Sequence, residues 1–327
     1  MTVSDEIISI PIPTPFPVGD VNCYVLRTEG ENILIDCGPD TLEAWQAMQQ
    51  ILARHDLQVE DLNRVIVTHH HADHAGMAHR FSEKGIPVYG HARLRPYLEQ
   101  DETFLNNGDA FLQRLATSFG VPSAIQEMLP SYQSALKWLG KGQLDFTLQE
   151  GDAITPSGRY RVIELPGHAS DQIGILSDDG VLFAADHLLD RVEPNPLLEQ
   201  PQPGDDALVK RPVLAYLDSL EKLQGEHIRI AYTGHGAPIR DVASLVEERL
   251  MQRKARGDQL LKYFSGEHTL FELAQVTYGN RLKKSFPLVM SEMKARLDTL
   301  VARGAITVEK RSGILYYSKM EEVKCNS

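Results

Sequence analysis

Two spacings of apolar residues alternate along the first half of the chain. Short runs rich in β-branched residues, at 21–26 (VNCYVL) and 64–68 (RVIVT), predict strands. Apolar residues three and four positions apart over 42–53 predict an amphipathic helix. The same patterns predict strands at 32–35, 161–165, 173–176, 181–184 and 228–231, and helices at 75–84 and 212–223. Strands that alternate with helices indicate an α/β protein whose sheets are covered by helices.

Residues 92–149 show a different pattern. Helical spacing predicts short helices at 94–98, 110–119 and 131–139, and no strand pattern interrupts them. We therefore expect a helical insertion in the sheet framework. Long insertions often form lids or pocket walls. In the alternative interpretation, the large apolar side chains only form a small core within the insertion. These side chains are Phe104, Phe111, Met128, Tyr132 and Trp138.

The last part of the chain carries its own series of elements. A long helix at 242–264 is followed by helices at 270–278 and 288–302, with a break at Gly279-Asn280 between the latter two. Two short strands, 305–309 and 314–317, flank a turn at Gly313. Helix, turn, helix and hairpin is the order of a winged helix. We expect a main domain over residues 1–250 and a winged-helix-like domain over 257–320.

Length and charge narrow the function classes. A chain of 327 residues fits one large domain with a smaller one. Its net charge of -12 argues against a protein that binds nucleic acid over its whole surface. The charge is uneven, because residues 257–327 hold 11 Lys and Arg against 8 Asp and Glu, whereas residues 1–256 hold 22 against 37. Nucleic acid is therefore a disfavoured partner, although the mildly basic residues 257–327 leave binding by that part as an alternative.

Cysteines and apolar runs bear on the compartment. Cys23, Cys37 and Cys325 are too few and too scattered for a disulfide framework. The first twenty residues lack the basic and apolar regions of a signal peptide, and no apolar run is long enough to cross a bilayer. We expect a cytoplasmic protein without a membrane partner.

The string His69-His70-His71-Ala72-Asp73-His74 follows a predicted strand and opens a helix. So many imidazoles cannot be buried without partners, and a metal ion satisfies most of them at once. His69 and His71 alternate along extended backbone and project to the same side, whereas Asp73 and His74 can reach a second ion. Imidazole and carboxylate suit Zn²⁺, with Fe or Mn as less preferred metals.

Further metal-ligand types follow later strands. His168 comes after a strand and a tight turn, Asp186 comes at the end of another strand, and His235 follows a third. Gly234 and Gly236 flank His235 and allow a close approach of the backbone. Each side chain lies at the carboxyl end of a strand, so we expect them to converge at one edge of the fold.

This ordered series resembles the signature of the metallo-β-lactamase superfamily over residues 21–238, with Asp36 matching its first motif. The resemblance implies an αββα sandwich with two divalent metal ions at one edge. It implies one ion held by His69, His71 and His168, a second held by Asp73, His74 and His235, and Asp186 bridging them. It also implies that Asp36 orients the ligand loops through hydrogen bonds, and that Asp73 accepts or relays a proton during attack by metal-activated hydroxide.

Departures from subfamilies narrow the expected reaction. His71 stands where the diiron oxygen reductases of this superfamily carry Glu, which favours hydrolysis over oxygen reduction. Secreted zinc β-lactamases lack the carboxylate that Asp186 supplies, so we do not expect β-lactamase activity. The pattern is similar to glyoxalase II-like proteins with a C-terminal winged helix, which Pro194-Asn195-Pro196 supports. We expect hydrolysis of a small-molecule ester, thioester or lactone. An endoribonuclease for single-stranded RNA and a winged-helix regulator are the alternatives, and a homodimer stays open.

Other polar residues receive ordinary structural interpretations. His70 lies between ligands and should face away from the metal ions. Lys283 and Lys284 precede the candidate recognition helix and are expected to form a solvated face. His79, His91, His187 and His227 lack ligand spacing.

Overall fold

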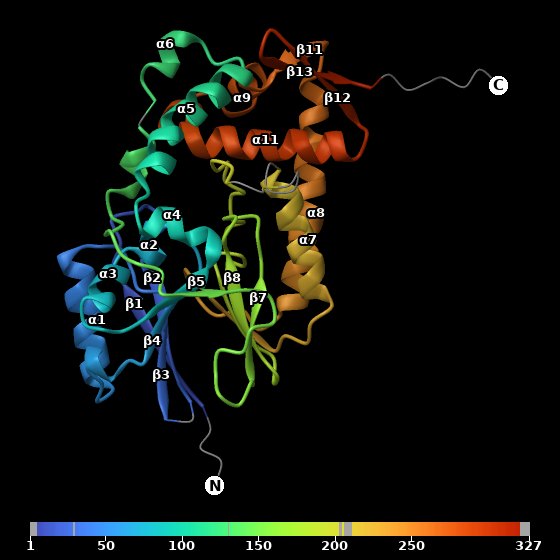
Figure 1. Ribbon diagram of the computed structural model, residues 1–327. Helices are drawn as coiled ribbons and strands as arrows, with labels where there is room; N and C mark the ends of the chain where they lie inside the picture. The colour runs from blue at the N-terminus through green and yellow to red at the C-terminus, as the bar shows by residue number, and fades with distance from the viewer. Residues whose placement is uncertain (1–4, 29, 130, 203–204, 206–210, 321–327) are drawn as a thin grey trace.

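Two β-sheets lie face to face between layers of helices in the computed structural model, which describes residues 5–28, 30–129, 131–202, 205 and 211–320 (Figure 1). The first sheet has the order β1-β2-β3-β4-β5-β6, and the second has the order β10-β9-β8-β7. The first sheet consists of β1 (Glu6–Ile12), β2 (Val21–Thr28), β3 (Glu31–Ile35), β4 (Arg64–Val67), β5 (Val88–His91) and β6 (Phe146–Leu148). The second consists of β7 (Tyr160–Glu164), β8 (Ile173–Ser177), β9 (Val181–Ala185) and β10 (Ile230–Thr233).

Strand direction brings several carboxyl ends to one edge. In the first sheet β3 to β6 run parallel, with Ile35 of β3 opposite Ile66 of β4. In the second sheet β9 and β10 run parallel, while β7 and β9 are each antiparallel to β8 and so share a direction. The loops that follow β3 and β4 therefore leave the first sheet at one edge, and the loops that follow β7, β9 and β10 leave the second sheet at one edge. Side chains from these loops can meet at a single edge of the sandwich.

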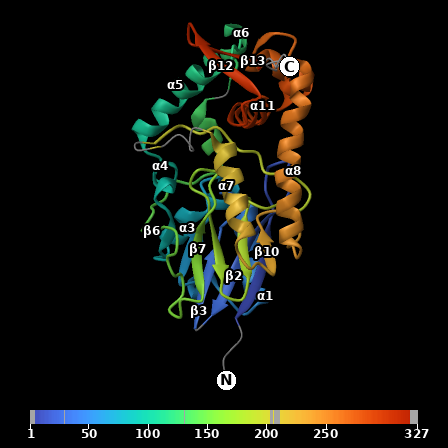
Figure 2. The ribbon, with the colours of Figure 1, turned by 90° about the vertical axis from the view of Figure 1, so that its right-hand side faces the viewer.

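Three apolar layers hold the sandwich together. One lies between the sheets, where Tyr24, Ile66 and Phe183 are buried together. A second packs the outer face of the first sheet against α1 (Leu42–Arg54) and α3 (Ala78–Ser82). The third packs the second sheet against α7 (Pro212–Gln224) and α8 (Val242–Leu260), which lie in front of it in Figure 2. This arrangement confirms the expected α/β fold with an αββα sandwich.

The helical insertion differs from the sequence prediction in two ways. It holds α4 (Arg95–Leu98), α5 (Glu102–Ser118), α6 (Ser123–Gln126) and two 3₁₀ turns, Ala92–Leu94 and Tyr132–Leu136, but it ends in strand β6, so the expected absence of strands over 92–149 is wrong. The idea of a separate core is also wrong. Phe104 joins the core of the first sheet, and Phe119 joins that of the C-terminal elements.

The predicted helix at 75–84 is divided in the structure. α2 (Ala72–Ala75) stops before Gly76, and α3 follows it. A Cβ at Gly76 would lie 2.4 to 2.5 Å from the backbone atoms Ala72 O, Asp40 N and Trp138 O. Backbone atoms of α2 and of two neighbouring loops thus fill the space beside Gly76, where only glycine fits. The helix is interrupted at the next residue, Met77, whose φ of -91° and ψ of 7° are not helical.

The C-terminal elements form a compact unit above the sandwich in Figure 1. α8 runs through residues 250 and 257, so both predicted domain limits fall inside one helix. A 3₁₀ turn (Leu261–Tyr263) precedes β11 (Glu267–Thr269), α9 (Leu270–Tyr278), α10 (Arg281–Lys284), α11 (Phe286–Ala302), β12 (Ile306–Arg311) and β13 (Ile314–Lys319). The sheet order is β11-β13-β12. The expected helices and hairpin are present, and β11 is an additional strand.

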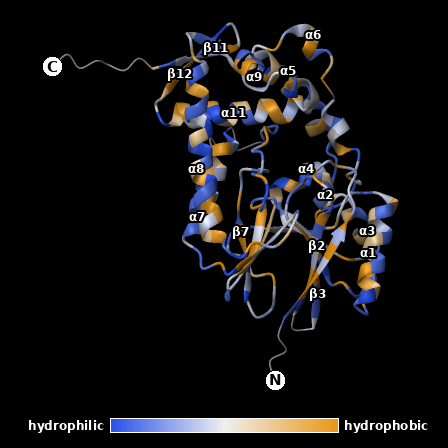
Figure 3. Ribbon diagram, turned by 180° about the vertical axis from the view of Figure 1, so that it is seen from behind, coloured by the Kyte–Doolittle hydropathy of each residue, from blue (hydrophilic) through white to orange (hydrophobic). Residues whose placement is uncertain are grey.

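Hydropathy distinguishes the strands from α8. Figure 3 shows hydrophobic stretches along the strands, whereas α8 is mainly hydrophilic. Cys23 and Cys37 are buried as free thiols, while Cys325 lies outside the described residues. The side chains of Lys283 and Lys284 are also outside the described part. Within the described ranges, no helix combines the length and apolarity that crossing a bilayer requires.

Candidate metal centre

The seven predicted ligands come together at one edge of the sandwich. They fall into three groups whose ligand atoms lie within 4.8 Å of one another. The groups are His69, His71 and His168; Asp73, His74 and His235; and His69, His74 and Asp186. The segments after β4, β7, β9 and β10 supply these side chains, and Asp73 and His74 lie in α2.

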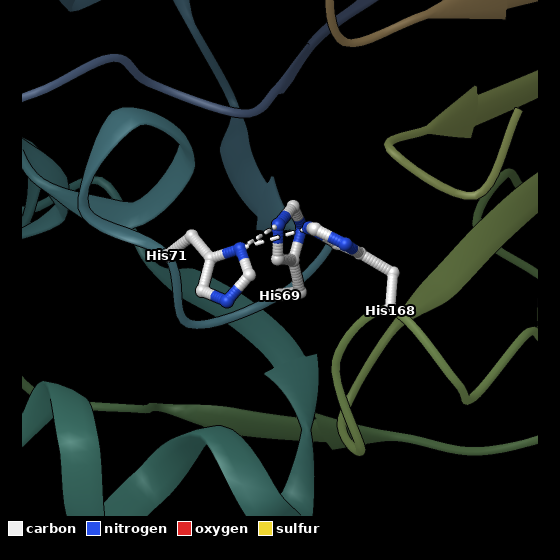
Figure 4. Close-up of side chains that lie close together, drawn as sticks. All are labelled: His69, His71 and His168. Carbon is white, nitrogen blue, oxygen red and sulfur yellow. Dashed lines mark hydrogen bonds between the residues drawn. The ribbon is translucent and has the colours of Figure 1, made fainter. Parts of the chain in front are cut away.

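The first group is a triangle of imidazoles (Figure 4). His71 Nδ1 lies 3.0 Å from both His69 Nε2 and His168 Nε2. At most one of these three nitrogens can donate a proton to another, so the remaining lone pairs repel unless a cation lies among them. The triangle therefore has the chemistry of a metal site.

Asp186 lies between the two histidine groups. Its Oδ2 is 3.6 Å from His168 Nε2 and also 3.6 Å from His235 Nε2. Its Oδ1 is 3.4 Å from His74 Nε2. On the far side, Asp73 Oδ2 is 3.4 Å from His235 Nε2. One carboxylate thus faces ligand nitrogens of both groups.

Asp36 supports the ligand loops from beneath. It follows β3 with a φ of +58°, a left-handed turn that is uncommon for residues other than glycine. Its Oδ1 accepts the backbone N–H of Thr68 at 2.8 Å. Its Oδ2 accepts from the Thr68 hydroxyl at 2.9 Å and from His74 Nδ1 at 2.7 Å. Asp36 therefore connects the loop after β3 to the segment after β4 that carries the candidate ligands.

Acceptors behind the rings determine which nitrogen faces inward. His74 Nδ1 donates to Asp36, His168 Nδ1 donates to the carbonyl of Asn195 at 3.0 Å, and His235 Nδ1 donates to the carbonyl of Asp20 at 2.7 Å. Each Nε2 is then left with a lone pair, which is the tautomer that a metal-ligating histidine needs.

Burial and charge divide the histidines further. Burial lowers the pKa of His69 and His71, and the neighbouring imidazoles lower both pKa values further. Burial also lowers the pKa of His168, although Asp186 opposes this effect. These three rings are neutral at pH 7 and fit for ligation, since a protonated imidazole cannot bind a cation.

The second group carries more negative charge. Burial lowers the pKa of His74 and His235, but nearby carboxylates outweigh it and raise both, with Asp186 and Asp36 acting on His74. Burial raises the pKa of Asp186, yet His74 and His235 outweigh it and lower that pKa. A cation at this position would take the place of the protons that these carboxylates attract.

The packing behind the centre leaves no room for larger residues. A Cβ at Gly234 would lie 2.1 Å from Asp186 Oδ1 and 2.7 Å from His74 Cε1. A Cβ at Gly167, beside His168, would lie 2.4 Å from Tyr216 Cα. The expected close approach at Gly234 is present, whereas nothing lies within 4 Å of a Cβ at Gly236.

His70 faces away from the ligand groups, as expected. Its Nδ1 bonds Asp171 Oδ1 at 2.8 Å, and its ring stacks on Tyr97 with centroids 3.8 Å apart. Sequence reasoning missed Asp171, the Thr68 hydroxyl and the acceptor carbonyls of Asp20 and Asn195. Only Asn195 could have been found from the sequence, because it lies in the Pro194-Asn195-Pro196 segment that supports the family resemblance.

Comparisons with known proteins agree with this geometry. The Metallo-beta-lactamase superfamily profile matches residues 16–235. The chain is 33% identical over 320 residues to the probable metallo-hydrolase YqjP of Bacillus subtilis (strain 168), covering 97% of this chain and 99% of that protein.

Two further relatives extend the comparison. The crystal structure of the metallo-beta-lactamase family protein TTHA1429 from Thermus thermophilus superposes with a TM-score of 0.78 and 28% identity, covering 96% of this chain and 98% of the other. An atrochrysone carboxyl ACP thioesterase of Aspergillus fumigatus is 23% identical over 251 residues, covering 76% and 61% of the two chains. With the profile and a nearly full-length relative in agreement, the chain belongs to the metallo-beta-lactamase superfamily.

Proposed function

We propose that this chain is a dinuclear metal-dependent hydrolase that acts on a small ester, thioester or lactone. The observation that carries the proposal is the position of Asp186, whose Oδ2 lies 3.6 Å from a ligand nitrogen of each histidine group. A carboxylate in that place can bridge two cations. Zn²⁺ suits this set of imidazoles and carboxylates, with Fe or Mn as alternatives.

The chain's own residues have separate roles in this proposal. Two bound ions would supply a water of lowered pKa and a Lewis acid for the substrate carbonyl. Asp73, at the rim of the second group, would hold its ion and accept or relay a proton. Asp36 would hold His74 in the ligating tautomer through the 2.7 Å hydrogen bond. No Ser or Cys nucleophile is needed.

Thioesters are the favoured substrates within this class. The Aspergillus fumigatus relative is named as an ACP thioesterase, and the Bacillus subtilis relative as a metallo-hydrolase. The same proposal includes a likeness to glyoxalase II-like proteins, a winged-helix identity for residues 257–320 and a cytoplasmic location. A homodimer stays open.

The test is a substrate panel. Metal-loaded protein should hydrolyse a simple acyl thioester, a lactone or a phenyl ester with a kcat/KM that falls at least tenfold after chelation and returns with Zn²⁺. Failure on all three classes, in protein that holds two ions, would contradict the assigned substrate class.

Cleavage of single-stranded RNA is the second candidate, and one surface feature favours it. A hollow of about 350 Å³ in the C-terminal unit is lined by the cations Lys262, Arg281 and Arg296 and by the aromatic residues Tyr263 and Tyr278. Cations with aromatic rings can bind the phosphates and bases of a single strand. Against it stands the acidic charge of residues 1–256. A regulator that only senses a metabolite would not need two ligand groups.

A further inference from the structure

The segment Leu189–Leu198, here called the strap, lies between the candidate metal centre and the C-terminal unit. It follows β9 and contains no helix or strand. In Figures 1 and 2 the chain after β9 passes beneath α11. The mechanism proposed above does not use the strap. The strap nevertheless contacts both the candidate metal centre and the C-terminal unit.

On its inner side the strap bonds a candidate metal ligand. The carbonyl of Asn195 accepts from His168 Nδ1 at 3.0 Å, and the N–H of Leu197 donates to the carbonyl of His168 at 3.4 Å. The ring and the backbone of His168 are therefore held by adjacent parts of the strap. His168 Nε2 then points at His71 Nδ1.

On its outer side the strap bonds α11. The side-chain amide of Asn195 donates to the carbonyl of Leu288 at 2.8 Å. Three residues on, the N–H of Leu198 donates to Ser291 Oγ at 3.3 Å. Asn195 thus contacts His168 through its carbonyl and α11 through its side chain.

Arginines of α8 fix the rest of the strap. Arg249 donates to the carbonyls of Leu189 and Asp190 at 3.0 and 2.8 Å. Arg253 donates to the carbonyl of Pro194 at 3.2 Å and pairs with Glu193, whose side chain is 1% exposed. Burying such charges is costly, so this network is better suited to fixing one backbone position than to adding stability.

We propose that Asn195 is a positioning residue for His168, through which the C-terminal unit sets the geometry of one metal site. This inference rests on the proposed metal centre. Loss of the Asn195 side chain frees its carbonyl to move, and His168 then loses the acceptor that fixes its tautomer and ring direction. Loss of such an outer hydrogen-bond partner weakens metal binding by about 10- to 100-fold.

The experiment titrates chelator-stripped full-length protein with Co²⁺ against a chromophoric competitor, and records the visible spectrum of the bound ions. Asn195→Ala should weaken one of the two Co²⁺ affinities at least about tenfold and alter that ion's absorption, while the other affinity changes less than about twofold. Asn195→Asp, which keeps the size but removes the donor to Leu288, should do the same. Asn32→Ala removes a similar amide-to-carbonyl bond, to Asp61 at 2.9 Å, and should change neither affinity.

Three results would overturn the proposal in distinguishable ways. Wild-type protein that binds no Co²⁺ removes the proposed function and the role of Asn195 together. Two ions with unaltered affinities in both Asn195 variants contradict the role of Asn195 alone. Equal loss of both ions, with a lower melting temperature of the stripped protein, shows general loosening in place of positioning.

Discussion

At the residue scale, three candidate ligands are each fixed by an acceptor behind the ring: His74 by Asp36, His168 by the carbonyl of Asn195 and His235 by the carbonyl of Asp20. His69, His71, Asp73 and His74 stand within six residues, and imidazoles at such density have few uses besides metal binding. The acceptors behind the rings are harder to find, because Asp20 and Asn195 use backbone carbonyls that every residue possesses. Asp36 was predicted as a partner because it matches the first motif of the superfamily signature, and its bonds are made by its own side chain.

Replacing Asp186 with Asn tests the bridging carboxylate. The change keeps the shape but removes the negative charge that faces both histidine groups. We expect kcat/KM to fall about 100-fold or more, in line with the loss of a preorganised charge. Folding stability is compared in Zn²⁺-bound protein, because the metal-free variant also loses the pairs with His74 and His235, and it should fall much less than turnover. Thioester hydrolysis at saturating Zn²⁺ measures the effect, and near wild-type turnover would show that Asp186 does not bridge.

Replacing Gly234 with Ala tests the close packing behind the ligands. The added methyl would lie 2.1 Å from Asp186 Oδ1, so the carboxylate or the backbone has to shift. We expect weaker binding of at least one ion, measured by competition with a chelator. Gly225→Ala is the control, since its Cβ would meet only Lys222 O at 3.4 Å. Equal metal affinities in the two variants would contradict this account.

At the element scale, local pattern found the strands whose apolar character is continuous. β4 and β9 begin at the predicted residues, whereas β5 (VYGH) and β6 (FTL) were missed, because neither contains a continuous apolar run. β1 was also missed, although Ile8, Ile10 and Ile12 alternate on one buried face. Contacts across the fold, such as those around Gly76, leave no such periodic trace.

The ion pairs between α8 and α11 predict a pH-dependent stability. Burial raises the pKa of Glu292, but Arg253 and Arg296 outweigh it and lower that pKa. The stabilisation is therefore complete above the unfolded-state pKa of about 4.3 and is lost as the pH falls through the lower folded-state value. Glu292→Gln should destabilise the protein by about 3–5 kcal/mol at pH 7 and by less at pH 3.

Urea unfolding of metal-free protein at pH 7, 5, 4 and 3 measures this difference. Glu247→Gln, an exposed position on α8, should change stability little at every pH. A difference between wild type and Glu292→Gln that stays constant down to pH 3 would contradict the assigned ion pairs.

At the scale of the whole molecule, the insertion and the C-terminal unit share one core. Phe119 and Val121 of the insertion are buried with Leu270 and Met293. The carbonyl of Phe119 accepts the N–H of Phe271 at 3.0 Å. Sequence spacing suggested each part separately, but contacts between residues so distant in the chain cannot be found from local pattern. The shared core favours a packing role for the C-terminal unit.

A charge-reversal variant separates packing from RNA binding. In Lys262→Glu/Arg281→Glu the basic hollow loses two exposed cations. We expect wild type to lack submicromolar affinity for single-stranded RNA, and the variant to retain full thioester hydrolysis. Submicromolar binding that weakens with salt and disappears in the variant would favour the nuclease alternative, because each neutralised phosphate releases a counterion.

Metal content of the active wild-type protein tests the central claim most directly. Elemental analysis after removal of loosely bound ions should find close to two metal ions per chain. His168→Ala and His235→Ala should each lose one ion preferentially, because these residues belong to different ligand groups. A fully active wild type that holds a single ion would contradict the dinuclear centre.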